Sequence, residues 1–345
     1  MKPVIGITMG DPAGIGPEIA LKALKNREIQ QSCIPVIIGD RISLEDANRL
    51  TGLGWKLNPV KQVGDAKGAY GTADYLDLSL LGDGPVDYGK VRADYGHAAF
   101  QYIVTAIGLA LEKKLHAVVT GPICKESIFL AGHHFAGHTE IFSHYTGTKD
   151  YAMMLIAGNL RVIHVTTHLS LRDACEMIKK ERVLKTIYLA DKAMKMIGLT
   201  QYKIGVAGLN PHSSENGLFG DEEGREIIPA IRLAQQEGIS VEGPIPPDTV
   251  FVKAMAGMYD VVVAMYHDQG HIPLKLSGFR MDPKSGRFTS VSGINTTIGL
   301  PIIRTSVDHG TAFDKAGKNI ANAESMEDAL RLAVTMATRQ ERETC

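Results

Sequence analysis

Short apolar runs, many of them β-branched, alternate along the chain with longer amphipathic segments. The short runs are typical of strands buried on both faces of a parallel sheet, and the longer segments repeat their apolar positions with a helical period. Strands are predicted at residues 4–8, 35–38, 117–119, 153–156, 162–165, 204–206, 261–265 and 302–305. Helices are predicted at residues 17–24, 95–113, 171–180, 183–197, 221–236 and 326–338. This alternation predicts an α/β fold built from βα units on a mostly parallel sheet.

Two stretches depart from this alternation. Residues 64–90 are rich in Gly and Asp and predict a loose excursion, and residues 278–293, GFRMDPKSGRFTSVSG, predict a long exposed loop or hairpin. Long loops in compact enzymes often serve function, but a tolerated surface insertion explains the second stretch equally well.

Length and charge narrow the class of protein. The 345 residues favour two domains or one large α/β unit. The 37 Lys and Arg nearly balance the 38 Asp and Glu without a block of like charge, so we expect a small soluble ligand rather than nucleic acid or a membrane. The predicted strand at residues 4–8 follows Met1 almost directly, and no apolar run approaches the roughly 20 residues of a membrane span, so we expect a cytoplasmic protein.

The cysteines give no sign of a cross-linked or metal-thiolate framework. Cys33, Cys124, Cys175 and Cys345 are scattered and form no C-x-x-C motif. We therefore expect reduced thiols.

Histidines follow three of the predicted strands. His168 comes after RVIHV, His212 after KIGVAGLN, and His267 after VVVAMY in the segment AMYHDQGHIP. A single strand-end imidazole is usually a packed or hydrogen-bonded residue, but ligands gather beyond the carboxyl ends of strands in α/β sheets, so three such residues favour a convergent metal site. Imidazole ligands favour Zn²⁺, Co²⁺ or Ni²⁺, whereas Mg²⁺ or Mn²⁺ would require more oxygen ligands.

Two carboxylates accompany these imidazoles. Asp268 adjoins His267, and Asp248 lies in GPIPPDTVF. Either side chain can orient a ligand histidine or accept a proton from a substrate. For Asp248, the N-cap of a helix is an almost equally good interpretation.

A second His-rich segment, AGHHFAGHTE, predicts an anion site. His138 and Thr139 lie in a turn that enters a predicted helix, where backbone amides attract negative charge, although Thr139 could simply cap that helix. Lys125, Lys275 and Arg304 are cations close to strand ends or turns and could neutralise a phosphate or a carboxylate.

Glycine-rich segments near both ends of the chain raise the question of a nucleotide. TMGDPAGIGPEIALK joins a strand to a helix but lacks the third glycine of G-x-G-x-x-G, so it predicts only a tight turn beside a ligand cleft. SVDHGTAFDKAGKNIANAE, residues 306–324, allows close backbone approach, and Asp314 within it could accept hydrogen bonds from a ribose diol. Without further information it is only a Gly- and Ala-rich loop.

Several long motifs together resemble one known family. MGDPAGIGPEI, AGHTE, TTHLSLRD, GLNPHSSENGLFGDEE, PPDTVF, AMYHDQGHIPLK and GLPIIRTSVDHGTAFD occur in this order over residues 4–322. They are similar to the motifs of the 4-hydroxythreonine-4-phosphate dehydrogenase family, the PdxA group. The resemblance covers nearly the whole chain.

The resemblance implies a fold and an assembly. It implies a homodimer of two-domain α/β/α subunits that resemble isocitrate and isopropylmalate dehydrogenases, with a cleft between the domains and an active site completed by the partner subunit. We expect one discontinuous domain of residues 1–125 and 292–345, which carries the cofactor loop, and a second domain of residues 126–291, which carries the metal ligands and the dimer interface.

The resemblance also assigns roles to single residues. It implies that His168, His212 and His267 bind the metal, with Zn²⁺ the first expectation and Co²⁺, Ni²⁺, Mg²⁺ or Mn²⁺ as alternatives. It places Asp248 and Asp268 close to the metal as the catalytic carboxylates. The residues implied to hold the phosphorylated substrate are His138, Thr139, Lys275, Asn295 and Arg304.

The cofactor implied by the resemblance is NAD. Residues 309–322 are similar to the adenosine-binding loop of isopropylmalate dehydrogenases, which implies cofactor contacts from His309, Gly310, Asp314 and Asn322. A carboxylate at position 314 would repel a 2′-phosphate, so NAD is expected rather than NADP.

Two departures from the family pattern bear on the substrate. Cys124 stands where the family usually has Asn, and the segment between Lys275 and Asn295 is longer than in most relatives. DYAMML, ENGLFGDEE and GPIPPDTVF resemble the branch that acts on D-threonate or D-erythronate 4-phosphate more than the vitamin B6 branch. The altered segment would also suit an aromatic cis-dihydrodiol carboxylate.

These expectations define an activity and its competitors. We expect NAD- and metal-dependent oxidation, with decarboxylation, of a 4-phosphorylated hydroxy acid such as 4-hydroxy-L-threonine 4-phosphate. The alternatives within the dehydrogenases are D-threonate or D-erythronate 4-phosphate and a dihydrodiol carboxylate. A metal-dependent phosphoesterase could use the same imidazoles but would not need Asp314.

Overall fold

The computed structural model describes residues 2–283 and 287–344 and divides the chain into two compact units. The first unit comprises Met1–Lys149 and Leu300–Cys345, and the second comprises Asp150–Gly299. The boundaries predicted from the sequence lie at residues 125/126 and 291/292, whereas in the structure residues 126–149 belong to the first unit and residues 292–299 to the second. The physical reason is that helices α5 (Lys125–Leu130) and α6 (His138–Thr146) pack on helix α4 (Ala93–Leu111) of that unit.

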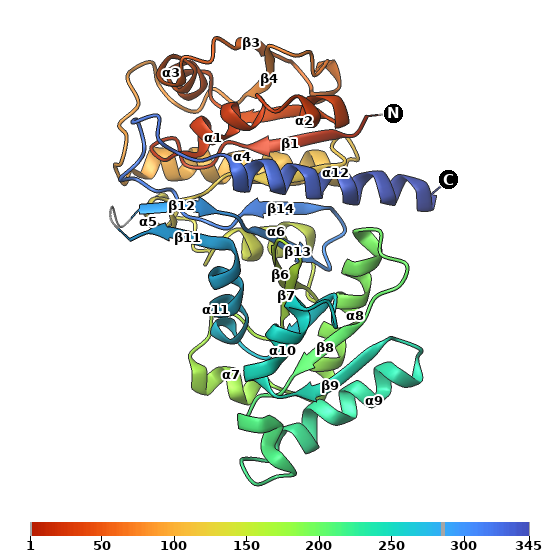
Figure 1. Ribbon diagram of the computed structural model, residues 1–345. Helices are drawn as coiled ribbons and strands as arrows, with labels where there is room; N and C mark the ends of the chain where they lie inside the picture. Colours follow the sequence, from red (N-terminus) through yellow and green to blue (C-terminus); the bar gives the residue numbers. More distant parts are fainter. Residues whose placement is uncertain (1, 284–286, 345) are drawn as a thin grey trace. The chain divides into compact units, whose positions relative to one another are not determined.

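In its described residues, the first unit contains six parallel strands in the order β3-β4-β2-β1-β5-β14 (Figure 1). Its strands are β1 (Val4–Thr8), β2 (Ile34–Gly39), β3 (Lys56–Pro59), β4 (Thr72–Asp77), β5 (Ala117–Thr120) and β14 (Arg304–Val307). Its remaining helices are α1 (Gly16–Ala23), α2 (Arg27–Ser32), α3 (Arg41–Thr51), the 3₁₀ turn η1 (Val63–Asp65) and α12 (Glu324–Thr344).

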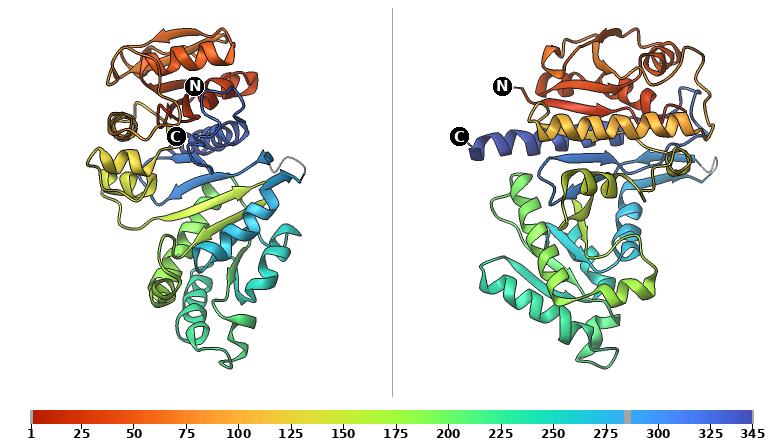
Figure 2. Two further views of the ribbon diagram at one scale, coloured as in Figure 1. Left: turned by 90° about the vertical axis from the view of Figure 1, so that its left-hand side faces the viewer. Right: turned by 180° about the vertical axis from the view of Figure 1, so that it is seen from behind.

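Two long helices cover this sheet. Figure 2 shows α4, in orange-yellow, and α12, in blue, running along the strands of the first unit. α4 packs on β1, β2 and β5, and α12 packs on β14, β5 and β1. Since both faces are covered, the central strands β1 and β5 are buried almost throughout, which is why they read as continuous apolar runs in the sequence.

The second unit contains a mixed sheet in the order β13-β6-β7-β10-β8-β9. Its strands are β6 (Ala152–Ala157), β7 (Leu160–His164), β8 (Ile204–Ala207), β9 (Val241–Ile245), β10 (Val261–Ala264) and β13 (Ile294–Ile298). β7, β10, β8 and β9 are parallel, whereas β6 pairs antiparallel with both β7 and β13. Its helices are α7 (Leu171–Met177), α8 (Lys180–Met196), η2 (Pro211–Glu215), the π-helix η3 (Glu223–Ile227), α9 (Ile228–Gln236), α10 (Pro247–Met255) and α11 (His267–Gly278).

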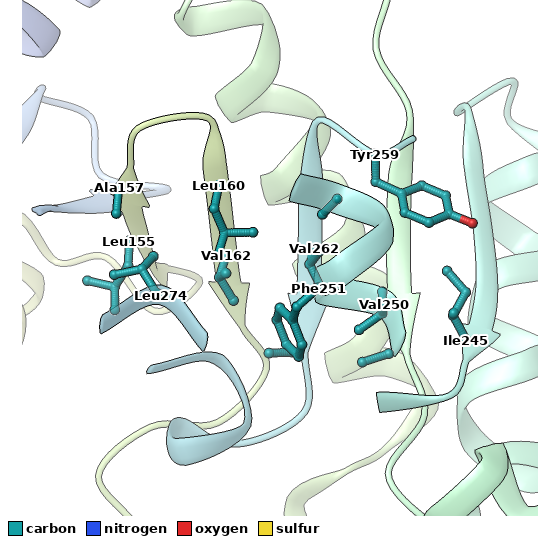
Figure 3. Packing of buried hydrophobic residues seen from close by; sticks show 13 residues of the cluster. Leu155, Ala157, Leu160, Val162, Ile245, Val250, Phe251, Tyr259, Val262 and Leu274 are labelled. Atoms are coloured by element: carbon teal, nitrogen blue, oxygen red, sulfur yellow. The ribbon is translucent and has the colours of Figure 1, made fainter. Parts of the chain in front are cut away.

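The core of the second unit lies where α10 and α11 pack on this sheet. Figure 3 shows Leu274 of α11 beside Leu155 of β6, and Phe251 of α10 beside Val262 of β10. A buried side chain of this size contributes about 1.5–3 kcal/mol relative to leaving it in water. The opposite face of the strands is covered by α8, so the run of residues 261–264 is buried on both sides.

Most of the predicted elements are confirmed, with some shifts. The α/β fold class is confirmed, and the strand predicted at 302–305 is present as Arg304–Val307. The helix predicted at 171–180 was too long, because α7 ends at Met177 and α8 begins at Lys180. The segment predicted as one helix over 221–236 begins as a π-helix and continues as α9.

The long stretch at residues 278–293 contains a hairpin. β11 (Phe279–Asp282) pairs antiparallel with β12 (Arg287–Val291), while residues 284–286 lie outside the described part of the chain. The three described cysteines, Cys33, Cys124 and Cys175, are free thiols, as expected, and Cys345 lies outside the described residues. Within the described ranges, no helix has the length and apolar character required to span a bilayer.

Candidate functional site

Three histidines follow the carboxyl ends of neighbouring parallel strands in the second unit. β7 precedes His168, β8 precedes His212, and β10, which pairs with both of these strands, precedes His267. Because the carboxyl ends of parallel strands share one edge of a sheet, all three side chains belong to the same edge.

His168 and His267 lie close to one another at this edge. Their ring centroids are 5.8 Å apart. Nδ1 of His267 is 2.6 Å from Oδ1 of Asp268, and this hydrogen bond lowers the pKa of the Asp268 carboxyl. A carboxylate only accepts, so the proton of a neutral His267 lies on Nδ1 and the lone pair lies on Nε2. His267 is therefore oriented as an Nε2 ligand, with Asp268 as the group that fixes its tautomer.

The ring of His271 lies beside that of His267, and the ring of His164 lies beside that of His271. The ring of His271 is nearly parallel to that of His267, with 3.6 Å between the centroids, and Nδ1 of His271 donates to the carbonyl oxygen of His267 over 2.9 Å. The ring of His164 lies 4.8 Å beyond that of His271. Burial lowers the pKa of His271 to about 4 and that of His164 to about 3, so both rings are neutral at neutral pH.

His164 was not singled out from the sequence, because it occupies the last position of the apolar strand β7 and reads as a strand residue. Its neighbour on α11 explains why it fits. A Cβ atom at Gly270 would lie 2.3 Å from Nε2 of His164, so only glycine lets the helix approach this closely. The G of the HDQGH motif thus serves packing.

His212 lies in an unusual backbone segment. Five consecutive non-glycine residues, from His212 to Asn216, have φ between 45° and 63°. The left-handed conformation costs about 1–2 kcal/mol per residue for L-amino acids, and such strain is typically concentrated at functional sites. The ring of His212 lies 6.2 Å from that of Phe219 in the same loop.

The structure does not gather all three predicted metal ligands within one chain. Over residues 2–283 and 287–344, no three His, Cys, Asp or Glu side chains lie close enough together to hold a metal ion. His168 and His267 form a pair, and His212 is held in its own loop. Imidazole nitrogens are suitable ligands for a divalent ion, but a single chain brings together only two of the three predicted ligands, His168 and His267.

The other predicted residues of the second unit lie on different elements. Asp248 is an exposed residue in the first turn of α10, whose N-cap is Pro246, so the N-cap interpretation of Asp248 is wrong. Lys275 is exposed on α11, with its ammonium 5.3 Å from the ring centroid of Phe279. Asn295 on β13 donates from Nδ2 to the sulfur of Met153, and its buried Oδ1 makes no hydrogen bond within the described residues.

The first unit holds a cationic cluster. Arg304 begins β14 and is buried, with Nη2 donating to Oγ1 of Thr120 over 2.8 Å. His138 is the first residue and Thr139 the second residue of α6, and Gly137 rather than Thr139 is the N-cap. Lys125 is the first residue of α5.

Burial and neighbouring charges shift the pKa values of Arg304 and His138. Burial lowers the pKa of Arg304 to about 9, opposed by the charge of Glu140, so the guanidinium stays charged at neutral pH. Burial, together with the charges of Arg304 and Lys125, lowers the pKa of His138 well below its usual value. Nε2 of this neutral imidazole is buried and has no hydrogen-bond partner in the described part of the chain. The cluster fits an anion that can replace water around a buried positive charge.

The predicted cofactor residues lie on an irregular segment between β14 and α12. Nδ1 of His309 donates to the carbonyl oxygen of Gly310 over 3.0 Å, and burial lowers the pKa of His309. Asp314 is exposed, and Oδ1 of Asn322 accepts from the backbone N–H of Glu324 at the start of α12.

The glycine-rich first turn supports this segment. The N–H of Ile15 donates to the carbonyl oxygen of Thr311 over 3.0 Å, and the N–H of Ala321 donates to Oε1 of the buried Glu18 over 2.9 Å. Lys22 donates to the same carboxylate and to the carbonyl oxygen of Ala321. These anchors were not recognised from the sequence, where Glu18 and Lys22 look like ordinary polar residues of an amphipathic helix.

Fold and site together define an α/β protein of two compact units, one with strand-end imidazoles and one with a buried cationic cluster beside a glycine-rich loop. A family model described as "Pyridoxal phosphate biosynthetic protein PdxA" matches residues 31–333. The chain belongs to this family, as its motifs indicated.

Relatives of known name match the chain over nearly its full length. A D-threonate 4-phosphate dehydrogenase of Cupriavidus necator is 47% identical over 98% of this chain and 98% of its own. The crystal structure of a 4-hydroxythreonine-4-phosphate dehydrogenase from Klebsiella pneumoniae is 43% identical, with a TM-score of 0.84, and covers 98% of both chains. A terephthalate 1,2-cis-dihydrodiol dehydrogenase from Burkholderia xenovorans is 30% identical, with a TM-score of 0.67, and covers 97% of this chain and 98% of its own.

Proposed function

We propose that this protein oxidises D-threonate 4-phosphate with NAD⁺ and a divalent metal ion. The choice of this substrate rests on one observation: the chain is 47% identical, over 98% of its length, to a D-threonate 4-phosphate dehydrogenase. The second candidate is 4-hydroxy-L-threonine 4-phosphate, favoured by solved relatives that are 43–44% identical and bear that name.

The cationic cluster of the first unit supports a phosphorylated substrate. Arg304 offers a charged fork that matches phosphate oxygens, and its Thr120 contact fixes the direction of that fork. The N-terminus of α6 adds a favourable dipole, and a bound phosphate would raise the pKa of His138, whose unpartnered Nε2 could then be protonated and donate to a phosphate oxygen. Binding energy from the remote phosphate would then hold the reacting carbon in place.

The imidazoles of the second unit would hold the divalent ion. His168 and Nε2 of His267 supply two ligands at one sheet edge, and His212 is proposed as the third. When bound, such an ion supplies the positive charge that lowers the pKa of the substrate hydroxyl.

The carboxylates of Asp268 and Asp248 are proposed to have different roles. Asp268 is committed to Nδ1 of His267 through its 2.6 Å hydrogen bond and is proposed to orient that ligand. Asp248 follows β9 at the same edge of the sheet as the imidazoles and is proposed to accept the hydroxyl proton. The segment with His309, Gly310, Asp314 and Asn322 would hold NAD⁺, which would supply the hydride acceptor when bound. Oxidation at C3 yields a β-keto acid, which can lose CO₂.

A second copy of the chain is proposed to complete the metal site. Each histidine-bearing segment also carries large exposed apolar side chains: Leu169 and Leu171, Leu218 and Phe219, and Ile272 and Leu276. Apolar residues gathered beside polar groups in this way are typical of a subunit interface. A homodimer that buries these residues could bring His212 of one chain to His168 and His267 of the other.

A substrate panel tests the proposal. D-threonate 4-phosphate, D-erythronate 4-phosphate, 4-hydroxy-L-threonine 4-phosphate and a cis-dihydrodiol carboxylate are each incubated with NAD⁺ and a divalent ion, and reduced cofactor is measured. The highest kcat/KM is expected for D-threonate 4-phosphate. A higher value for any other compound would replace the proposed substrate, and phosphate release without cofactor reduction would replace the reaction class.

A further inference from the structure

Glu223 anchors the loop that presents His212. This carboxylate is fully buried, and its Oε1 accepts the backbone N–H groups of Leu209 and Asn210 over 2.8 and 2.7 Å. Its Oε2 accepts Nδ2 of Asn210 over 2.9 Å. The two residues held in this way immediately precede Pro211 and His212, so the loop leaves β8 from a fixed point.

The anchor is itself fixed by the backbone. Glu223 begins the π-helix η3, a rare conformation that occurs frequently at functional sites. Gly220, with φ of +125°, lies so near Asn210 that an added Cβ would come within 2.7 Å of Nδ2. The two ends of the loop from Leu209 to Gly220 therefore meet at the Asn210 side chain.

The strain of the left-handed segment requires such an anchor. Five consecutive non-glycine residues with positive φ would relax to ordinary conformations unless the surrounding structure prevented it. Within the segment, Ser214 accepts from the N–H groups of Gly217 and Phe219. These contacts close the far side of the loop, whereas Glu223 supplies the contacts on the strand side.

We propose that Glu223 is the positioning residue for His212, holding the strained loop so that the imidazole is presented to a divalent ion. This inference rests on the proposed role of His212 as a metal ligand. Glu223 touches neither substrate nor ion in this account, and its effect passes through the backbone of Leu209 and through the backbone and side chain of Asn210.

A conservative variant isolates this role. In Glu223→Gln, one oxygen can still accept the two backbone N–H groups, but the new amide places a donor opposite Nδ2 of Asn210, which is also a donor. The matched control is Glu226→Gln. Glu226 lies in the same π-helix and accepts the backbone N–H of Lys180 over 2.9 Å, so it makes the same kind of bond to α8 instead of the His212 loop.

The experiment titrates the metal-free full-length protein with Co²⁺ and follows the visible absorption of the bound ion. We expect His212→Ala to weaken Co²⁺ binding at least 100-fold, Glu223→Gln to weaken it roughly 10- to 100-fold, and Glu226→Gln to leave it unchanged. Hydrogen exchange is measured on the same samples without metal, and faster exchange confined to residues 209–220 is expected in Glu223→Gln.

The outcomes separate the inference from the function on which it rests. Wild-type Co²⁺ affinity in His212→Ala would overturn both. Loss of binding in His212→Ala with wild-type affinity in Glu223→Gln would overturn only the positioning role, as would an equal loss in Glu226→Gln. If Glu223→Gln does not fold, Asn210→Ala, which removes only the side-chain bonds, is expected to weaken Co²⁺ binding at least threefold, and unchanged affinity there would overturn the inference.

Discussion

The imidazoles of His267 and His271 lie face to face, with 3.6 Å between ring centroids and 13° between ring planes. The hydrogen bond from the side-chain Nδ1 of His271 to the backbone carbonyl oxygen of His267 fixes the His271 ring. The His271 ring in turn restricts the rotation of the His267 ring. His271 belongs to the same AMYHDQGHIP segment as His267, but the sequence alone assigned it no role. The stacking gives it a definite effect on the geometry of a proposed metal ligand.

Replacing His271 should therefore weaken metal binding. We expect His271→Ala to raise the dissociation constant of Zn²⁺ about tenfold, because the His267 ring gains rotamers that do not face the ion. His271→Phe keeps an aromatic ring beneath His267 and should lose less affinity. Competition with a chromophoric chelator measures both, with Ser277→Ala of the same helix as the control. Equal affinities in all four proteins would show that the stacking has no such effect.

Stability should fall in mild acid, and His164 should account for part of the loss. Burial lowers the pKa of His164 to about 3, whereas an unfolded histidine titrates near about 6.5. Between these values the unfolded state binds more protons, so the free energy of unfolding decreases as the pH falls. For this one group the loss between pH 7 and pH 5 is on the order of 2 kcal/mol, and His271, whose pKa is also lowered, adds a loss of the same sign.

Urea unfolding of the metal-free protein at several pH values measures this effect. His164→Asn cannot titrate but can still donate to the carbonyl oxygen of Met153, the partner of Nδ1 in the wild type. Its unfolding free energy should depend less on pH than that of the wild type. Parallel pH profiles for the two proteins would rule out His164 as a contributor.

Asp314 should control the use of the cofactor. If its exposed carboxylate binds the ribose diol, Asp314→Ala should raise the KM for NAD⁺ about tenfold or more, leave the KM for substrate nearly unchanged, and reduce the preference for NAD⁺ over NADP⁺. Asp83→Ala removes another exposed carboxylate, one that lies outside the loop, and serves as the control. Steady-state kinetics with both cofactors would contradict the assignment if Asp314→Ala kept wild-type values.

Mixing two inactive variants should restore activity. If His212 of one chain meets His168 and His267 of its partner, a heterodimer of His212→Ala and His168→Ala contains one fully mutated and one intact site. Random exchange of subunits should then recover roughly a quarter of the wild-type activity. No recovery, despite heterodimers demonstrated by differently tagged chains, would mean that the three imidazoles act within one chain.

The parts of this structure that the sequence predicted are those governed by local pattern. The buried strands β1, β5, β8 and β10 are nearly continuous apolar runs, and β7 is apolar except for Arg161 and His164. A residue that follows such a strand must lie at the sheet edge, so the placement of His168, His212 and His267 needed no tertiary information. The edge strands β3 and β9 were missed because they are partly exposed and contain proline, which is tolerated at sheet edges but obscures the pattern.

The features that the sequence could not predict depend on packing between distant elements. Helix α11 contains both Gly270 and Pro273, so propensity argues against it, yet Gly270 is required for contact with His164 on β7. The left-handed run at His212–Asn216 contains residues that rarely adopt this conformation, and the buried Glu223 that anchors the loop is distant from it in sequence. Neither His164 nor Glu223 differs in local sequence from an ordinary strand or helix residue.

The most direct measurement of the central claim follows the hydride. D-threonate 4-phosphate that carries deuterium on the carbon to be oxidised is incubated with the enzyme, NAD⁺ and a divalent ion, and the reduced cofactor is analysed by mass spectrometry. The account predicts that the deuterium appears on the reduced nicotinamide and that chelation of the metal abolishes the transfer. Unlabelled cofactor, or release of inorganic phosphate with no reduction of NAD⁺, would contradict it.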